Sequence, residues 1–133
     1  MRLRIISIMM SLIFVCSFAA CGNQAEKSVV YEYVQITPEE AKNLMETESD
    51  YIILDVRTEE EFAEGHIENA VLIPDYEIGV RAEKELPDKN QLILVYCRSG
   101  RRSKIASQTL ADMGYSDVRE FGGIIDWMYE IVK

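Results

Sequence analysis

The chain has 133 residues, 48% of them hydrophobic and 28% charged, which suits one globular domain with its own core and excludes a largely disordered protein. Its 23 acidic residues outnumber its 14 lysines and arginines, giving a formal net charge of −9. So acidic a chain is a poor electrostatic match for nucleic acids or anionic lipids, and we expect no nucleic-acid partner.

The N-terminal residues 1–20 have the layout of an export signal. Arg2 and Arg4 precede an apolar run, IISIMMSLIFVCSF at residues 5–18, and small residues follow it up to Cys21. The run is too short to favour a permanent transmembrane helix. We therefore expect residues 1–20 to be a signal peptide. Its removal takes away two arginines and no acid, and changes the net charge from −9 to −11.

Residues 17–21, SFAAC, resemble the lipobox of bacterial lipoproteins, although Phe18 stands where leucine is usual. That resemblance implies that Cys21 is lipidated and becomes the first mature residue, with residues 21–33 forming the lipidated N-terminus and a tether. The protein would then be exported, and lipid-anchored to the outer face of the cytoplasmic membrane or in the periplasm. An ordinary cut after Ala20 and an uncleaved anchor helix are the alternatives.

The remainder of the chain alternates between strand-like and helix-like segments. We expect strands at residues 31–36, 51–56, 70–73, 92–97 and 117–121. We expect helices at residues 37–48, 58–65, 76–86, 101–114 and 122–133. Thr37, Pro38 and Glu40 form a capping-box signature at the start of the first helix, and Gly65 and Gly114 stop the second and fourth.

Two of these strands, YIILDV at residues 51–56 and LILVYC at residues 92–97, are apolar without alternation. This pattern indicates a parallel sheet that is covered on both faces. Repeated strand–helix units with right-handed crossovers predict a doubly wound α/β domain of about five strands. In such sheets, functional sites gather beyond the carboxyl ends of the strands, which is where Cys97 falls.

The loop at residues 97–103, CRSGRRS, gathers positive charge around a cysteine in an acidic chain. Cys16 would be removed with the signal peptide and Cys21 would carry lipid, so Cys97 would be the only free thiol of the mature chain. Such a thiol is either a reactive group or a small buried hydrophobic residue. A turn through Ser99 and Gly100 can point its amides inward, and the helix that follows directs free N–H groups at the same place. The added charges are those of Arg98, Arg101 and Arg102. All these features favour a thiolate, so we expect Cys97 to be a nucleophile.

The loop CRSGRRS resembles the active-site loop of rhodanese-domain sulfurtransferases. ILDVRTEEEFAEGHIENAVLIP at residues 53–74 and GGIIDW at residues 122–127 resemble the first and closing signatures of that family. The resemblance covers residues 34–133 and implies a single rhodanese-like domain. Asn69 stands where the family usually has glycine, a departure that the fold can accommodate because asparagine tolerates left-handed backbone.

The resemblance also implies a reaction. Cys97 would take the outer sulfur of an anionic donor such as thiosulfate, become a persulfide, and pass that sulfur to a thiophilic acceptor. Arg98 and Arg101 would attract the donor, Arg102 would brace the loop, and the backbone of the loop would hold the persulfide. The loop residues concerned are Arg98, Ser99, Gly100, Arg101, Arg102 and Ser103. The resemblance implies no cofactor and no metal.

Outside the loop, Asp55 ends a core strand on the same edge as Cys97. We expect it to hold Arg57 or an arginine of the loop, as structural support. His66, the only histidine, is expected to be a packing residue rather than a catalytic base. Trp127 and its neighbours are expected to form the apolar face of the last helix.

Two other functions are alternatives to this sulfur-transfer reaction. A cysteine phosphatase with a related loop clamps phosphate with an arginine at the loop's last position, which is Ser103 here. A non-catalytic persulfide carrier, redox sensor or envelope-binding module stays open as the alternative. The acidic surface favours a monomer.

Overall fold

The computed structural model describes residues 28–133. The predicted signal peptide and Cys21 lie outside these residues. The strands are β1 (Val34–Gln35), β2 (Tyr51–Asp55), β3 (Val71–Leu72), β4 (Leu92–Cys97) and β5 (Val118–Gly123). The helices are α1 (Pro38–Thr47), α2 (Glu59–Glu64), α3 (Ile78–Glu85) and α4 (Arg101–Asp112), with short 3-10 turns η1 (Asp75–Glu77) and η2 (Ile124–Asp126).

The strands form one sheet in the order β1-β5-β4-β2-β3, and every neighbouring pair is parallel. The predicted parallel α/β sheet is thus confirmed. β4 lies at its centre, and all six of its residues are buried, which explains its unbroken apolar sequence. β1 and β3 are shorter than predicted because each lies at an edge and pairs with a neighbour on one side only.

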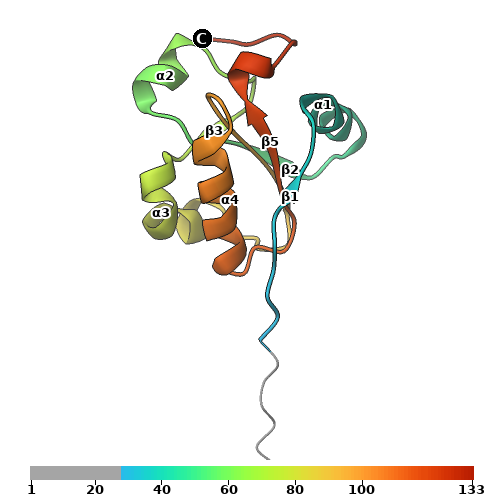
Figure 1. Ribbon diagram of the computed structural model, residues 1–133, viewed down its shortest axis with the longest axis vertical. Coiled ribbons are helices and arrows are strands. Elements are labelled where there is room, and N and C mark those ends of the chain that lie inside the picture. Colours follow the sequence, from blue (N-terminus) through green and yellow to red (C-terminus); the bar gives the residue numbers. More distant parts are fainter. Residues whose placement is uncertain (1–27) are drawn as a thin grey trace, which may run out of the picture.

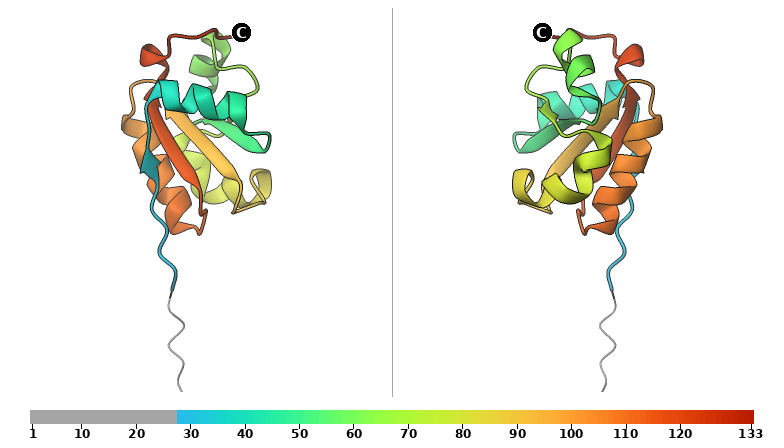
Figure 2. Two further views of the ribbon diagram at one scale, coloured as in Figure 1. Left: turned by 90° about the vertical axis from the view of Figure 1, so that its right-hand side faces the viewer. Right: turned by 90° about the vertical axis from the view of Figure 1, so that its left-hand side faces the viewer.

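Helices cover both faces of the sheet, with α1 on one side and α3 and α4 on the other (Figure 1). Figure 2 shows the two layers in turn, α1 in front in its left view and α3 with α4 in front in its right view. Each face has its own apolar core. Ala41 of α1 packs with Leu94 and Phe121, whereas Leu110 of α4 packs with Val95. Burial of these side chains is the main stabilising contribution to the fold.

Two helices begin with a complete capping box. In α1 the Thr37 hydroxyl accepts from the Glu40 amide, and the Glu40 carboxylate accepts from the Thr37 amide at 2.7 Å. In α2 the same reciprocal pair joins Thr58 and Glu61. The first box was predicted and is confirmed. The second fixes the place of Glu61, which contributes to the site described below.

The predicted last helix, residues 122–133, is wrong. β5 continues through Gly123, which lies opposite Cys97 in the sheet, and only the turn η2 follows. The remaining segment is not helical, and Val132 in it exchanges two backbone hydrogen bonds with His66, of 2.8 and 2.9 Å. Trp127 therefore packs against Phe121 rather than on a helix face, and Met128 is 92% exposed.

The two ends of the described chain lie at opposite ends of the domain (Figure 1). Residue 28 leaves at the bottom of the view, whereas α2 and the C-terminal segment lie together at the top. The carboxyl end of β5 points to this upper side, so the C-terminal segment borders the edge of the sheet that carries Cys97. Within residues 28–133, no helix has both the length and the apolar character that a membrane span requires.

Candidate active site

Cys97 is the last residue of the central strand β4 and is 1% exposed. Its side chain adjoins the core, yet its Sγ atom faces a polar group, because the amide of Gly100 donates to it at 3.0 Å. A backbone N–H aimed at sulfur stabilises a thiolate more than a thiol. Cys97 is the one free cysteine among the residues that the structure describes.

The loop is tight because two glycines allow it to be. Gly100 has a φ of 101°, in the left-handed region, and is the N-cap of α4. The loop also crosses directly over Gly123, where an added Cβ would lie 2.0 Å from the carbonyl oxygen of Arg98. That carbonyl accepts a hydrogen bond from the Ile125 amide at 3.2 Å. The end of β5 therefore holds the loop in place.

A buried polar cluster lies beside the Cys97 sulfur. The buried hydroxyl of Ser103 lies 3.4 Å from the Cys97 sulfur and donates to the carboxylate of Glu120 at 2.6 Å. Glu120 lies on β5 and is 1% exposed. Ser103 was predicted as a loop residue. Glu120 was not predicted, because nothing in DVREF marks one acid as buried.

Arg102 binds Glu61 of α2 with two parallel hydrogen bonds of 2.7 and 2.8 Å. This two-pronged geometry is the strongest form of an arginine–carboxylate pair. The hydrogen bonds from Arg102 are the main cause that lowers the pKa of Glu61 from 4.5 to about 2. The pair ties the start of α4 to α2 across the site.

Arg98 and Arg101 have no such partner. Both side chains are exposed, and within residues 28–133 neither forms an ion pair. Ser99, between them, is exposed as well. The outer side of the loop thus carries two free positive charges, which an anion can approach from solvent.

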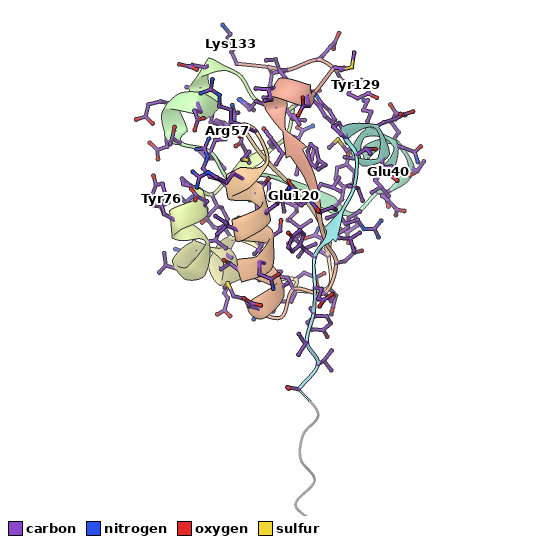
Figure 3. All side chains as sticks on the ribbon, in the orientation of Figure 1. Glu40, Arg57, Tyr76, Glu120, Tyr129 and Lys133 are labelled. Carbon is purple, nitrogen blue, oxygen red and sulfur yellow. The ribbon has the colours of Figure 1, made fainter. Side chains whose placement is uncertain are left out.

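Asp55 and Arg57 form a buried ion pair with a shortest distance of 2.6 Å. The same guanidinium donates to the carbonyl of Gly65 at 2.7 Å, so Asp55 holds Arg57 and not an arginine of the loop. Tyr96 stands beside the pair and accepts a hydrogen bond from the Ile67 amide through its hydroxyl. Burial, reinforced by the charge of Asp55, raises the pKa of Tyr96. These residues support the carboxyl edge of the sheet, where Figure 3 shows Arg57.

Two other singled-out residues lie outside the loop. His66 stacks on Phe62 with ring centroids 3.6 Å apart, and its Nδ1 lies 2.9 Å from the Phe62 carbonyl oxygen. It is a packing residue. Asn69 has a φ of 65°, a left-handed conformation that asparagine tolerates, as expected from the sequence.

A groove of about 710 Å³ lies between α1, β2 and the C-terminal segment, lined among others by Met45, Tyr51, Trp127 and Tyr129. No residue of the loop lines it. Within residues 28–133, no group of three or more histidine, cysteine, aspartate or glutamate side chains is placed to hold a metal ion.

Comparison with known proteins gives a consistent result. Residues 37–130 match the rhodanese-like domain family. The chain is 40% identical over 80 residues to the thiosulfate sulfurtransferase PspE of Escherichia coli, covering 60% of this chain and 77% of that protein. It is 40% identical over 88 residues to a sulfurtransferase of Allochromatium vinosum, covering 65% of this chain and 79% of that protein. A solved structure of an E. coli rhodanese with anions matches with a TM-score of 0.59 and 37% identity, and the match covers 62% of this chain and 98% of that chain.

Proposed function

The chain belongs to the family of rhodanese-like domains, and from that premise we propose that it is a thiosulfate-type sulfurtransferase that works through a persulfide on Cys97. The observation that carries the proposal is the position of the Cys97 sulfur, which ends the central strand and accepts the Gly100 amide at 3.0 Å. The relatives named thiosulfate sulfurtransferase and sulfurtransferase support the reaction class.

In the first step, the Cys97 thiolate attacks the outer sulfur of thiosulfate. A new S–S bond forms to Cys97, the S–S bond of the donor breaks, and sulfite leaves with the electron pair. The charge passes to the outer sulfur of the new persulfide. The Gly100 amide, which already points at Sγ, and the neighbouring amides of the loop are the groups that would stabilise that anion, as preorganised donors do in other enzymes.

In the second step, a thiophilic acceptor attacks the outer sulfur and Cys97 leaves as a thiolate. With cyanide as acceptor the product is thiocyanate, and with a thiol it is a new persulfide. Both steps are displacements at sulfur, so the balance needs no further oxidant or reductant. Arg98 and Arg101 attract the anionic donor, and Arg102, through its pair with Glu61, holds the loop rather than the donor.

The test is turnover. Purified protein is incubated with thiosulfate and cyanide, and thiocyanate is followed with time. We expect repeated cycles that Cys97→Ser abolishes. A single equivalent of protein-bound sulfur without turnover would instead identify a persulfide carrier, and absence of any bound sulfur would contradict both roles.

We propose further that the domain is exported and attached to a membrane by lipid on Cys21. The apolar run of residues 5–18 and the SFAAC stretch support this. Intact mass of the protein from its native membrane tests it. We expect a mature chain that starts at Cys21 and carries acyl mass, and a chain that retains Met1 would contradict the proposal.

A further inference from the structure

Glu120 is a buried carboxylate without a cation. It is 1% exposed, and among residues 28–133 no lysine or arginine forms an ion pair with it. Its Oε1 accepts from the Ser103 hydroxyl at 2.6 Å and from the backbone amide of Gly122 at 2.8 Å, and its Oε2 accepts from the side-chain amide of Gln35 at 3.2 Å. All three partners are groups that can donate, so the site offers the carboxylate the contacts that its charged form needs. Figure 3 shows Glu120 inside the domain, between α4 and β1.

The Ser103 hydroxyl links this charge to the reactive sulfur. A hydroxyl has one proton to donate, and three acceptors compete for it: Glu120 Oε1 at 2.6 Å, the Gly100 carbonyl at 3.1 Å and the Gly122 carbonyl at 3.3 Å. The shortest bond is the one to the carboxylate. Ser103 therefore directs its proton away from Cys97, although its oxygen lies only 3.4 Å from the sulfur.

This arrangement acts differently on the two anionic forms of Cys97. In the free thiolate the negative charge rests on Sγ, one hydroxyl group away from the carboxylate, and like charges in a buried site repel. In the persulfide the charge moves to the outer sulfur. Because Ser103 occupies the space between Sγ and Glu120, the outer sulfur must extend away from Glu120, where the repulsion is weaker.

We propose that Glu120, acting through Ser103, is a positioning residue that disfavours the free Cys97 thiolate more than the persulfide and thereby biases the domain toward its sulfur-loaded state. The inference rests on the proposed persulfide function. It adds that the equilibrium between free Cys97 and its persulfide is shifted toward the persulfide. A domain tuned in this way holds sulfur until a strong acceptor arrives.

Other charged groups surround the cluster and stay constant in the test. They are Arg98 on the loop, Arg101 and Arg102 on α4, Glu61 on α2, Asp75 in η1, and the neutralised pair Asp55 and Arg57 beside β2. Glu120→Gln removes one charge from this set. The glutamine oxygen can still accept from Ser103 and Gly122. Its NH2 group replaces Oε2, and keeps a bond to Gln35 once the Gln35 side-chain amide turns over and presents its oxygen.

The first measurement is the alkylation rate of Cys97 by iodoacetamide in the full-length protein, followed by the mass of the peptide that contains Cys97. At about pH 6.5, below the ordinary pKa of a thiol of about 8.5, we expect Glu120→Gln to react on the order of tenfold faster than the parent. At about pH 10.5 the rates should converge. A merely loosened structure would react faster at both pH values, and that result, or an unchanged or slower rate, would overturn the proposal.

The second measurement is the loading equilibrium. Protein is mixed with thiosulfate and sulfite in fixed ratio at about pH 10, where free thiols are ionised, and the persulfide fraction is read from intact mass. We expect the ratio of loaded to free Cys97 to fall several-fold in Glu120→Gln. An equal or higher ratio would overturn the proposal.

Further variants separate the possible causes. Glu120→Asp keeps the charge and should stay close to the parent in both measurements. If Glu120→Gln fails to fold, Glu120→Ala, which also removes the charge, takes its place with the same expected and contradicting results. In a Ser103→Ala background, Glu120→Gln should have a clearly smaller effect, since the link is lost. Glu39→Gln removes an exposed acid and should change nothing. If the parent forms no persulfide, the proposed function fails, and the alkylation comparison alone decides the role of Glu120.

Discussion

Glu61 and Arg102 join two helices that are far apart in sequence, through paired hydrogen bonds of 2.7 and 2.8 Å. The same Glu61 carboxylate also accepts from the Thr58 amide at 3.0 Å, which completes the capping box of α2. One side chain thus starts a helix and anchors the reactive loop to it. Loss of its charge should affect the stability of this whole end of the domain.

The pair predicts how stability depends on pH. The pKa of Glu61 falls from 4.5 to about 2 on folding, so its stabilising contribution is fully present above 4.5 and is lost as pH falls toward 2. At about pH 7, Glu61→Gln should lower the free energy of unfolding by about 1 kcal/mol. Denaturant titrations should show this difference shrinking between 4.5 and 2. Glu60→Gln, on the exposed side of α2, is the control. A difference independent of pH would contradict the assignment.

The buried pair of Asp55 and Arg57 predicts a larger loss. Asp55→Asn leaves the Arg57 guanidinium buried without a counter-charge, and should cost about 3 kcal/mol in the free energy of unfolding. Replacing both, in Asp55→Asn with Arg57→Met, removes the unpaired charge and should cost clearly less than the two single changes added together. Chemical denaturation of the parent, the two single variants and the double variant gives a double-mutant cycle. Strict additivity would show that the two side chains act independently.

The close crossing at Gly123 predicts an effect on activity rather than on stability alone. A methyl group there would meet the Arg98 carbonyl at 2.0 Å, so Gly123→Ala must push the loop off its present path. We expect thiocyanate formation to fall by at least roughly tenfold. Gly79→Ala in α3 is the matched control, because an added Cβ there meets nothing within 4 Å, and it should leave activity intact while raising stability by about 0.5 kcal/mol. Full activity in Gly123→Ala would exclude this role of the crossing.

The free charges of the loop predict an effect on substrate affinity. Arg101→Gln should raise the KM for thiosulfate about three- to tenfold with a smaller change in kcat, since the charge attracts the donor and does not touch the cleaved bond. The effect should diminish as salt concentration rises. Lys84→Gln, on α3 away from the loop, should leave both constants unchanged. A fall in kcat at constant KM would instead assign Arg101 to the chemical step.

The sequence predicted those features whose causes are local. The capping box at Thr37, the unbroken apolar strand β4 and the turn at Gly100 each depend on residues close together in the chain, and all three are present. The last helix failed because the residues after Gly123 satisfy their backbone elsewhere, through the pairing of Val132 with His66. No local pattern encodes that pairing.

The carboxylates that contact the loop could not be predicted from the sequence, for a similar reason. Glu61 was visible as part of a helix and Glu120 as part of a strand, each one acid among many. Only the folded chain brings Glu61 to Arg102 and Glu120 to Ser103. A parallel sheet does predict that β4 and β5 end together, so an acid near the end of β5 was the one available signal.

The two ends of the described chain lie at opposite ends of the domain, and this affects how other molecules can approach the carboxyl edge of the sheet (Figure 1). If the protein is held at a surface by anything that precedes residue 28, the carboxyl edge of the sheet, where β4 ends at Cys97, lies on the side of the domain away from that surface. Large acceptor proteins would then approach this edge from the side away from the surface. A change in the length of the segment that precedes residue 28 would not block that approach.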